Sequence, residues 1–77
     1  MARLPSEQWL IQQIGGIVIL FHEYTEEEIV RFDPSDDNAV AKAQGVIANS
    51  EKLSPEDRSL ANFWSGYFYA YASGKLN

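Results

Sequence analysis

Apolar residues in the first third of the chain recur at the spacing of an α-helix. Successive members are three or four positions apart, except for one adjacent pair, Ile17 and Val18. The set is Leu10, Ile14, Ile17, Val18, Phe21 and Tyr24. Ser6 precedes this run and is a suitable N-cap, with Glu7 in the favourable first turn. The pattern therefore predicts a first helix that begins after Ser6, with Gly15-Gly16 as a point of local weakness.

The last third carries the most pronounced apolar pattern, over about Pro55–Ala72. Six of its residues are aromatic: Phe63, Trp64, Tyr67, Phe68, Tyr69 and Tyr71. On a helix, Leu60, Trp64, Tyr67 and Tyr71 fall on one line. We expect this helix to bury its aromatic side against most of the remaining chain.

Local capping signals divide the rest of the chain. Asp33-Pro34 and Ser54-Pro55 each combine a capping residue with a proline, which the first helical position tolerates. They predict helices over about 34–49 and 55–72. Thr25 is followed three residues later by Glu28, a capping box, and this predicts a short helix over about 26–32.

These elements make the predicted fold class all-α, a small three-helix bundle with an additional short helix, in a single helical domain over 1–77. The alternative is an α+β fold with a β-hairpin at about 17–32. It is suggested by the strand-forming run Ile17–Phe21, and it pairs 17–24 with 27–32. The residues Tyr24-Thr25-Glu26 at its turn are not those that make tight hairpin turns, which favours the helical interpretation.

Composition adds a marked acidic segment to this picture. The 77 residues include no cysteine and carry a formal net charge of −5. Between Glu23 and Asp37 lie seven acids against one base, a net charge of −6 for that segment. This disfavours direct binding to nucleic acid or to an anionic membrane, which require clustered lysine and arginine. The start of the chain lacks the features of a secretion signal, so we expect a soluble, cytoplasmic protein.

The charge concentration predicts the function and its residues. We expect a small acidic protein–protein interaction module, an adaptor or an inhibitor, that docks this face on a basic partner surface and competes there with nucleic acid. The predicted partner-binding residues are Glu23, Glu26, Glu27, Glu28, Asp33, Asp36 and Asp37. Small size, acidity and the absence of a cofactor motif also suit an accessory protein of a virus or mobile element. An acidic face that only keeps the protein soluble is the simpler interpretation.

Two alternative functions use the aromatic helix. In the first, the protein is a homo-oligomer that self-associates through leftover aromatic surface or through a ridge of mostly small residues. The ridge residues and the adjoining aromatic are Asn62, Gly66, Tyr69 and Ala70. In the second, a small ligand binds in a pocket among Trp64, Tyr67 and Tyr71.

No motif in the sequence predicts catalysis, a cofactor or a metal site, so we expect a protein that is not an enzyme. His22 and Glu23 begin like a zinc-helix motif, but Glu26 stands where the second histidine is needed. On a continuing helix, His22 and Glu26 would form only half of a metal site, with Asp33 or Asp36 needed to complete it. A calcium loop counted from Asp33 lacks the turn glycine at its sixth position and the glutamate at its twelfth. Trp64-Ser65-Gly66 is not a nucleophile elbow.

Overall fold

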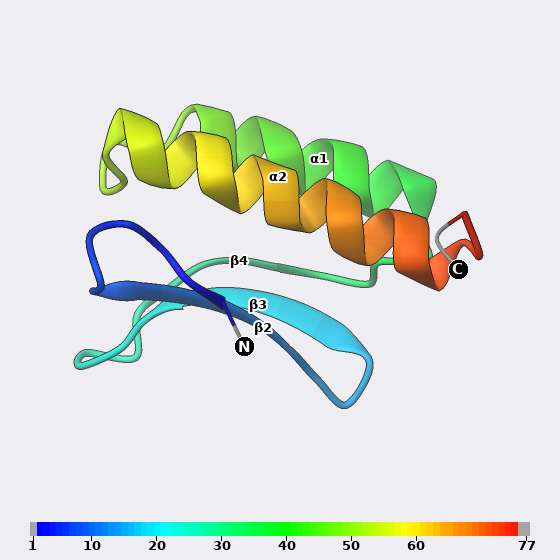
Figure 1. The fold of residues 1–77 in the computed structure, drawn as a ribbon, viewed down its shortest axis with the longest axis horizontal. Coiled ribbons are helices and arrows are strands. Elements are labelled where there is room, and N and C mark those ends of the chain that lie inside the picture. The colour runs from blue at the N-terminus through cyan, green and yellow to red at the C-terminus, as the bar shows by residue number, and fades with distance from the viewer. Residues whose placement is uncertain (1, 76–77) are drawn as a thin grey trace.

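The computed structural model describes residues 2–75 and contains a four-stranded sheet followed by two helices (Figure 1). Its elements in chain order are β1 (Ala2–Arg3), β2 (Trp9–Ile14), β3 (Ile17–His22), β4 (Glu28–Phe32), α1 (Asp37–Ala48) and α2 (Pro55–Ala72). Both helices cover the same face of the sheet, and the opposite face has no helix over it (Figure 1). The fold is therefore α+β, in two layers.

The sheet is an antiparallel meander in the order β1-β2-β3-β4. Gly15 and Gly16 join β2 to β3 with φ angles of 57° and 87°. Two successive left-handed residues are what a tight two-residue hairpin turn requires, and glycine adopts them without a steric penalty. A β-bulge between β3 and β4 follows Leu20, where the register shifts by one residue.

The all-α prediction is wrong, and so is the helical bundle. The predicted helix after Ser6 is β2 and β3, and the predicted helix over 26–32 is β4. Glycines at the turn, together with β-branched residues on both sides, favour strands there. Thr25 accepts a hydrogen bond from the Glu27 N–H within the β3–β4 turn and caps no helix. The alternative hairpin over about 17–32 matches the pairing of β3 with β4.

The two predicted C-terminal helices are present, and one of their two predicted caps is confirmed. Ser54 caps α2, accepting a hydrogen bond from the Asp57 N–H at 3.1 Å, with Pro55 as the first helical residue. α1 begins three residues later than predicted, because Asp36 is its cap in place of Asp33. Asp33 instead accepts hydrogen bonds from Ser35 in the preceding turn.

The core lies between the helices and the covered face of the sheet. Its buried members come from every layer: Leu4, Trp9, Ile11, Val18, Leu20, Phe32, Val40, Ala43, Ile47, Leu53 and Ala61. Trp64, Phe68 and Tyr69 of α2 are half-buried against it. The predicted burial of the aromatic helix is therefore only partial. In the described range, neither α1 nor α2 has the length and apolar character of a membrane span.

Candidate functional site

The seven predicted partner-binding acids lie in two groups, one at each end of β4 (Figure 1). Glu23, Glu26 and Glu27 lie in the β3–β4 connection and Glu28 opens β4, whereas Asp33, Asp36 and Asp37 lie between β4 and α1 or in the first turn of α1. The five residues of β4 span roughly 15 Å at the usual rise per residue. The structure does not bring the seven acids together as one surface.

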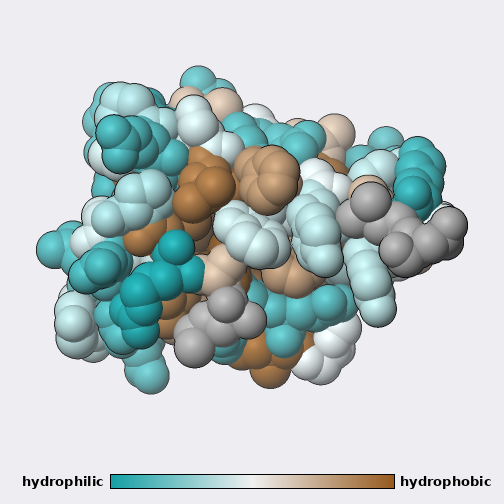
Figure 2. Space-filling model, viewed as in Figure 1, coloured by the Kyte–Doolittle hydropathy of each residue, from teal (hydrophilic) through white to brown (hydrophobic). Residues whose placement is uncertain are grey.

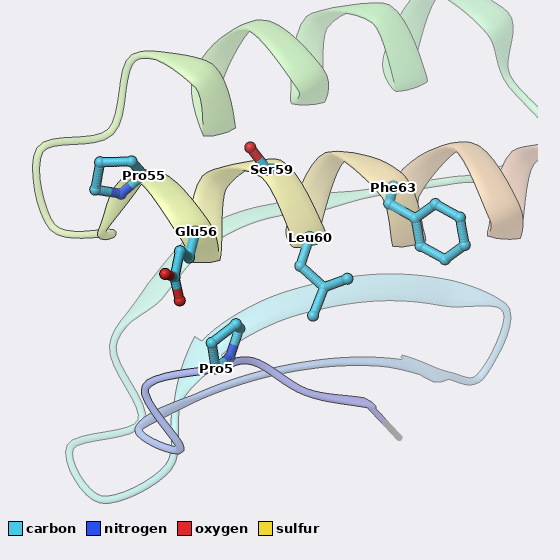
Figure 3. Close-up of a pocket in the computed structure, with 6 residues that line it drawn as sticks. All are labelled: Pro5, Pro55, Glu56, Ser59, Leu60 and Phe63. Atoms are coloured by element: carbon cyan, nitrogen blue, oxygen red, sulfur yellow. The ribbon is translucent and has the colours of Figure 1, made fainter.

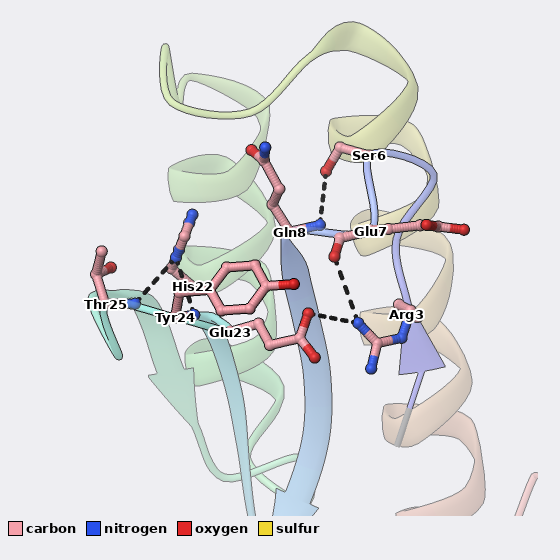
Figure 4. A network of polar contacts seen from close by, with 8 residues as sticks. All are labelled: Arg3, Ser6, Glu7, Gln8, His22, Glu23, Tyr24 and Thr25. Atoms are coloured by element: carbon pink, nitrogen blue, oxygen red, sulfur yellow. Dashed lines mark hydrogen bonds and ion pairs between the residues drawn. The ribbon is translucent and has the colours of Figure 1, made fainter.

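Glu23 is engaged within the chain, by Arg3 of β1. The Arg3 Nη1 atom donates to Glu23 Oε2 at 2.6 Å and also to the Glu7 carbonyl oxygen at 3.3 Å (Figure 4). The hydrogen bond from Arg3 is the main cause that holds the pKa of Glu23 below its ordinary value of 4.5. This pair ties the edge strand to the end of β3.

Two of the remaining glutamates also form ion pairs within the chain. Glu27 pairs with Lys52 of the α1–α2 connection, and Glu28 pairs with Arg31 on its own strand. The hydrogen bond from Arg31 lowers the pKa of Glu28. Glu26 is exposed, has a φ of 62°, and makes no ion pair within residues 2–75.

The three aspartates mainly organise the turn that leads into α1. Asp33 accepts from the Ser35 N–H at 2.9 Å and from its hydroxyl at 2.7 Å, and these bonds lower the pKa of Asp33. Asp36 accepts from the N–H groups of Asn38 and Ala39 as the cap of α1. Asp37 occupies the favourable first turn of that helix. Helix initiation therefore accounts for this group.

His22 is held by the turn that follows it. Its Nδ1 atom accepts hydrogen bonds from the backbone N–H groups of Tyr24 and Thr25, both at 3.2 Å (Figure 4). Its ring packs edge-on against Trp9, with centroids 4.9 Å apart. Among residues 2–75, no three metal-ligating side chains of His, Asp or Glu are grouped, so His22 and Glu26 are not completed as a site.

The predicted self-association ridge lies along the contact between α1 and α2. A Cβ atom at Gly66 would lie 3.8 Å from the side-chain nitrogen Nε2 of Gln44, which belongs to α1. Asn62 and Ala70 are half-buried, and Tyr69 packs against the core while its hydroxyl accepts from Lys75. The separation at Gly66 is an ordinary van der Waals contact, so the ridge lies within the chain but this contact does not itself require glycine.

Sequence reasoning missed an apolar surface on the uncovered face of the sheet. Paired residues of antiparallel strands share a face, and successive residues alternate between faces. Pairing places Leu10 opposite Phe21, and Ile14 opposite Ile17, on the face away from the helices. Ile19, which pairs with Arg31, lies on the same face. Leu10 is 5% exposed, yet it is not part of the core cluster, as expected of a residue on the outer face.

A hollow forms where this outer face meets the β3–β4 turn. We call it the sheet hollow, and its volume is about 340 Å³. It is lined by Ile14, Ile19, Phe21, Glu26 and Glu28. Apolar side chains form most of it, and two carboxylates complete it. Such a site suits a side chain with an apolar stem and a cationic end.

A second exposed apolar surface lies along the flank of α2. Phe63, Tyr67 and Tyr71 recur every four residues, which places them on one line of the helix, and we call them the aromatic stripe. They are 60%, 42% and 66% exposed. Figure 2 shows hydrophobic side chains at the centre of this view, where α2 lies. Tyr67 and Tyr71 are therefore exposed to solvent. The three hollows identified in residues 2–75 are lined by residues other than the predicted set of Trp64, Tyr67 and Tyr71.

The aromatic stripe borders a shallow groove between α2 and the N-terminal segment (Figure 3). This groove, which we call the Pro5 groove, has a volume of about 610 Å³. It is lined by Pro5, Pro55, Glu56, Ser59, Leu60 and Phe63. Leu60 points from α2 toward Pro5, and Phe63 projects from the next turn of the helix (Figure 3). A prominent ring and a recess of apolar character thus lie side by side.

Comparison with known proteins gives no relative for this chain. No family model, no curated protein and no solved structure matches it. The function is therefore argued from the two apolar surfaces and the charges around them.

Proposed function

We propose that the protein is a small protein–protein interaction module that binds a basic side chain of its partner in the sheet hollow. The observation that carries the proposal is the position of Glu26 and Glu28 beside an apolar surface of Ile14, Ile19 and Phe21. Apolar area and negative charge are both available there to one incoming residue. The acidic docking predicted from composition is thereby confined to two of the seven acids.

An arginine or lysine suits the hollow in each of its parts. The methylene stem packs on Ile14 and Ile19 while the charged end remains near the carboxylates. The half-buried ring of Phe21 adds attraction for a cation that lies over its face. Glu26 makes no ion pair within residues 2–75 and is available to the partner, whereas Glu28 is shared with Arg31.

The proposed role is that of an adaptor or inhibitor acting in the cytoplasm, without catalysis. Basic patches that bind nucleic acid present the arginine and lysine side chains that the sheet hollow would accept. Binding such a patch would place this protein in competition with nucleic acid. The net charge of −5 would favour encounter with a basic surface, and salt would weaken it.

The test is a titration of the protein with a short peptide of alternating arginine and leucine, followed by amide NMR at low salt. We expect the largest shifts at Ile14, Ile19, Phe21 and Glu26. Glu26→Lys should weaken binding roughly tenfold, since one attraction is replaced by repulsion of an adjacent cation. The matched control is Glu51→Lys, the same charge reversal outside the sheet hollow, which should change the affinity less than about twofold.

Equal weakening by both reversals would show that the peptide responds only to net charge. Shifts spread over all carboxylates, or absent from Ile14 and Ile19, would likewise contradict the proposed site.

A further inference from the structure

The flank of α2 that bears the aromatic stripe has no charged residue. Between Ser59 and Ser73 the sequence contains no Asp, Glu, Lys or Arg, although 22% of the whole chain is charged. Three rings on this segment are 42% to 66% exposed. Exposed helix faces are ordinarily rich in charge, and contiguous exposed apolar surface of this kind marks an interaction site.

The size of this surface suits a small and weak protein interface. If each ring offers about 200 Å² when fully exposed, the aromatic stripe leaves roughly 340 Å² open per chain. This is about two fifths of the area of about 800 Å² per partner that typical interfaces bury, and the neighbouring Pro5 groove adds to it. Phe63, at 60% exposure, lines the outer edge of that groove.

We propose that the aromatic stripe and the Pro5 groove form a twofold interface with a second copy of this chain. With antiparallel α2 helices related by an axis between Ser59 and Phe63, the Phe63 ring of each copy enters the Pro5 groove of the other. Tyr67 then reaches Pro55 and Glu56 of the other copy, where its hydroxyl can donate to the carboxylate. An interface of this kind needs a projection and its matching recess on the same surface; α2 provides the projection, and α2 together with Pro5 provides the recess.

Charge distribution favours a second copy over other occupants. Two chains of net charge −5 repel each other, and the repulsion is weakest where the facing surfaces carry little charge. The aromatic stripe carries none, and Glu56 is the one charged residue that lines the Pro5 groove. An uncharged helix flank also gives no electrostatic means to select a basic or an acidic partner. The sheet hollow lies on the uncovered face of the sheet, so the dimer does not depend on the function proposed above.

The first experiment measures the mass of the full chain by sedimentation equilibrium over a dilution series. We expect a mass near 8.7 kDa at low concentration and near twice that value at high concentration, with a midpoint between about 1 µM and 1 mM. Phe63→Glu should raise the dissociation constant at least tenfold. The matched control is Tyr24→Glu, which changes an aromatic that is 76% exposed on another part of the molecule and should leave the dimer intact.

A mixing experiment tests the twofold arrangement itself. Ser59→Lys places a cation in the Pro5 groove, and it should weaken the dimer of that variant on its own. An equal mixture of Phe63→Glu and Ser59→Lys chains should form a heterodimer more tightly than either variant forms a homodimer, because the carboxylate introduced in one chain meets the ammonium group introduced in the other. Circular dichroism verifies that both variants keep the native helix and strand content.

A mass of 8.7 kDa at all concentrations up to about 1 mM would overturn the proposal and leave the aromatic stripe to a different macromolecule. A dimer that is unaffected by Phe63→Glu would also overturn it, as would the absence of any heterodimer in the mixture.

Discussion

Asp57 shows how one side chain can join distant parts of this small fold. It is 1% exposed, and its Oδ1 atom accepts a hydrogen bond from the Ser6 N–H at 3.1 Å. The same residue lies in the first turn of α2, where negative charge is favourable. The N-terminal segment that contributes Pro5 to the groove is thus attached to α2 through this carboxylate.

Asp57→Ala should lower the free energy of unfolding by about 2–3 kcal/mol, because it removes a buried acceptor and leaves the Ser6 N–H without its partner. Asp57→Asn, which keeps an oxygen at the same place, should recover part of this loss. The matched control is Asp37→Ala in the exposed first turn of α1, with an expected loss of at most about 1 kcal/mol. Urea unfolding followed by circular dichroism measures all three. A loss of equal size at Asp37 would contradict the role of the Ser6 contact.

At the scale of the elements, the glycine turn determines whether the first third of the chain is extended. Gly15 and Gly16 both have positive φ, and a Cβ atom at either would meet nothing within 4 Å. The cost of a substitution there is therefore conformational, without a steric clash. Gly45 in α1 also has open space around it, but its backbone is helical.

Gly16→Ala should destabilise the protein by about 1–2 kcal/mol, since alanine is strained at a φ of 87°. Gly45→Ala should stabilise it by about 1 kcal/mol, because alanine is the better helix former. Gly15→Asn should be nearly neutral, because asparagine tolerates the left-handed region. Chemical denaturation of the three variants tests the turn; destabilisation of similar size by both alanine variants would contradict it.

The sequence pattern predicted the helices well and the strands poorly, for a physical reason. Ser54-Pro55 fixes the start of α2 through local contacts, which sequence displays directly. Strands with one apolar face show alternation, but β3 is apolar on both faces, with Leu20 inward and Ile19 outward. Without alternation, the run from Leu10 to Phe21 fits a helical spacing equally well, and only the turn glycines distinguish the two.

The candidate sites depended on contacts that no local pattern contains. Glu23 pairs with Arg3 twenty residues away, and Glu27 with Lys52 twenty-five residues away. These pairs, and the separation of the acids by β4, follow from the sheet topology. The aromatic residues were recognised from the sequence, but their division between core and surface depends on how α2 lies on the sheet.

For the molecule as a whole, the surface ion pairs give stability a dependence on pH. The pKa of Glu23 and that of Glu28 are lowered in the folded state by Arg3 and Arg31. The unfolded chain therefore binds more protons in acid than the folded chain. The stabilisation from the two ion pairs is complete above the ordinary pKa of 4.5, and it is lost as pH falls through the lowered pKa values of the folded state. Both pairs are exposed, so each contributes little on its own.

We expect the free energy of unfolding to fall as pH drops below the ordinary pKa of 4.5, and Glu23→Gln to reduce the slope of that fall. Glu51→Gln is the control, because Glu51 makes no ion pair within residues 2–75 and should leave the slope unchanged. Urea unfolding at half-unit pH intervals measures the three curves. A Glu23→Gln curve parallel to that of the original chain would show that the Arg3 pair does not contribute.

The shortness of β1 has a consequence for how the protein behaves when it is concentrated or heated. Within the described residues, β1 pairs only with Leu10 and Ile11. The edge of β2 at Gln13 and Ile14 therefore offers backbone N–H and C=O groups to another extended chain. The stretch Trp9–Phe21 has no charge and no proline, a composition that is prone to fibril formation once it is released from the fold. Thermal melts should therefore end in aggregation, and light scattering during a melt would reveal it. Reversible measurements on this chain are better made with denaturant, and stock solutions are better kept above about pH 6, where mutual repulsion slows such growth.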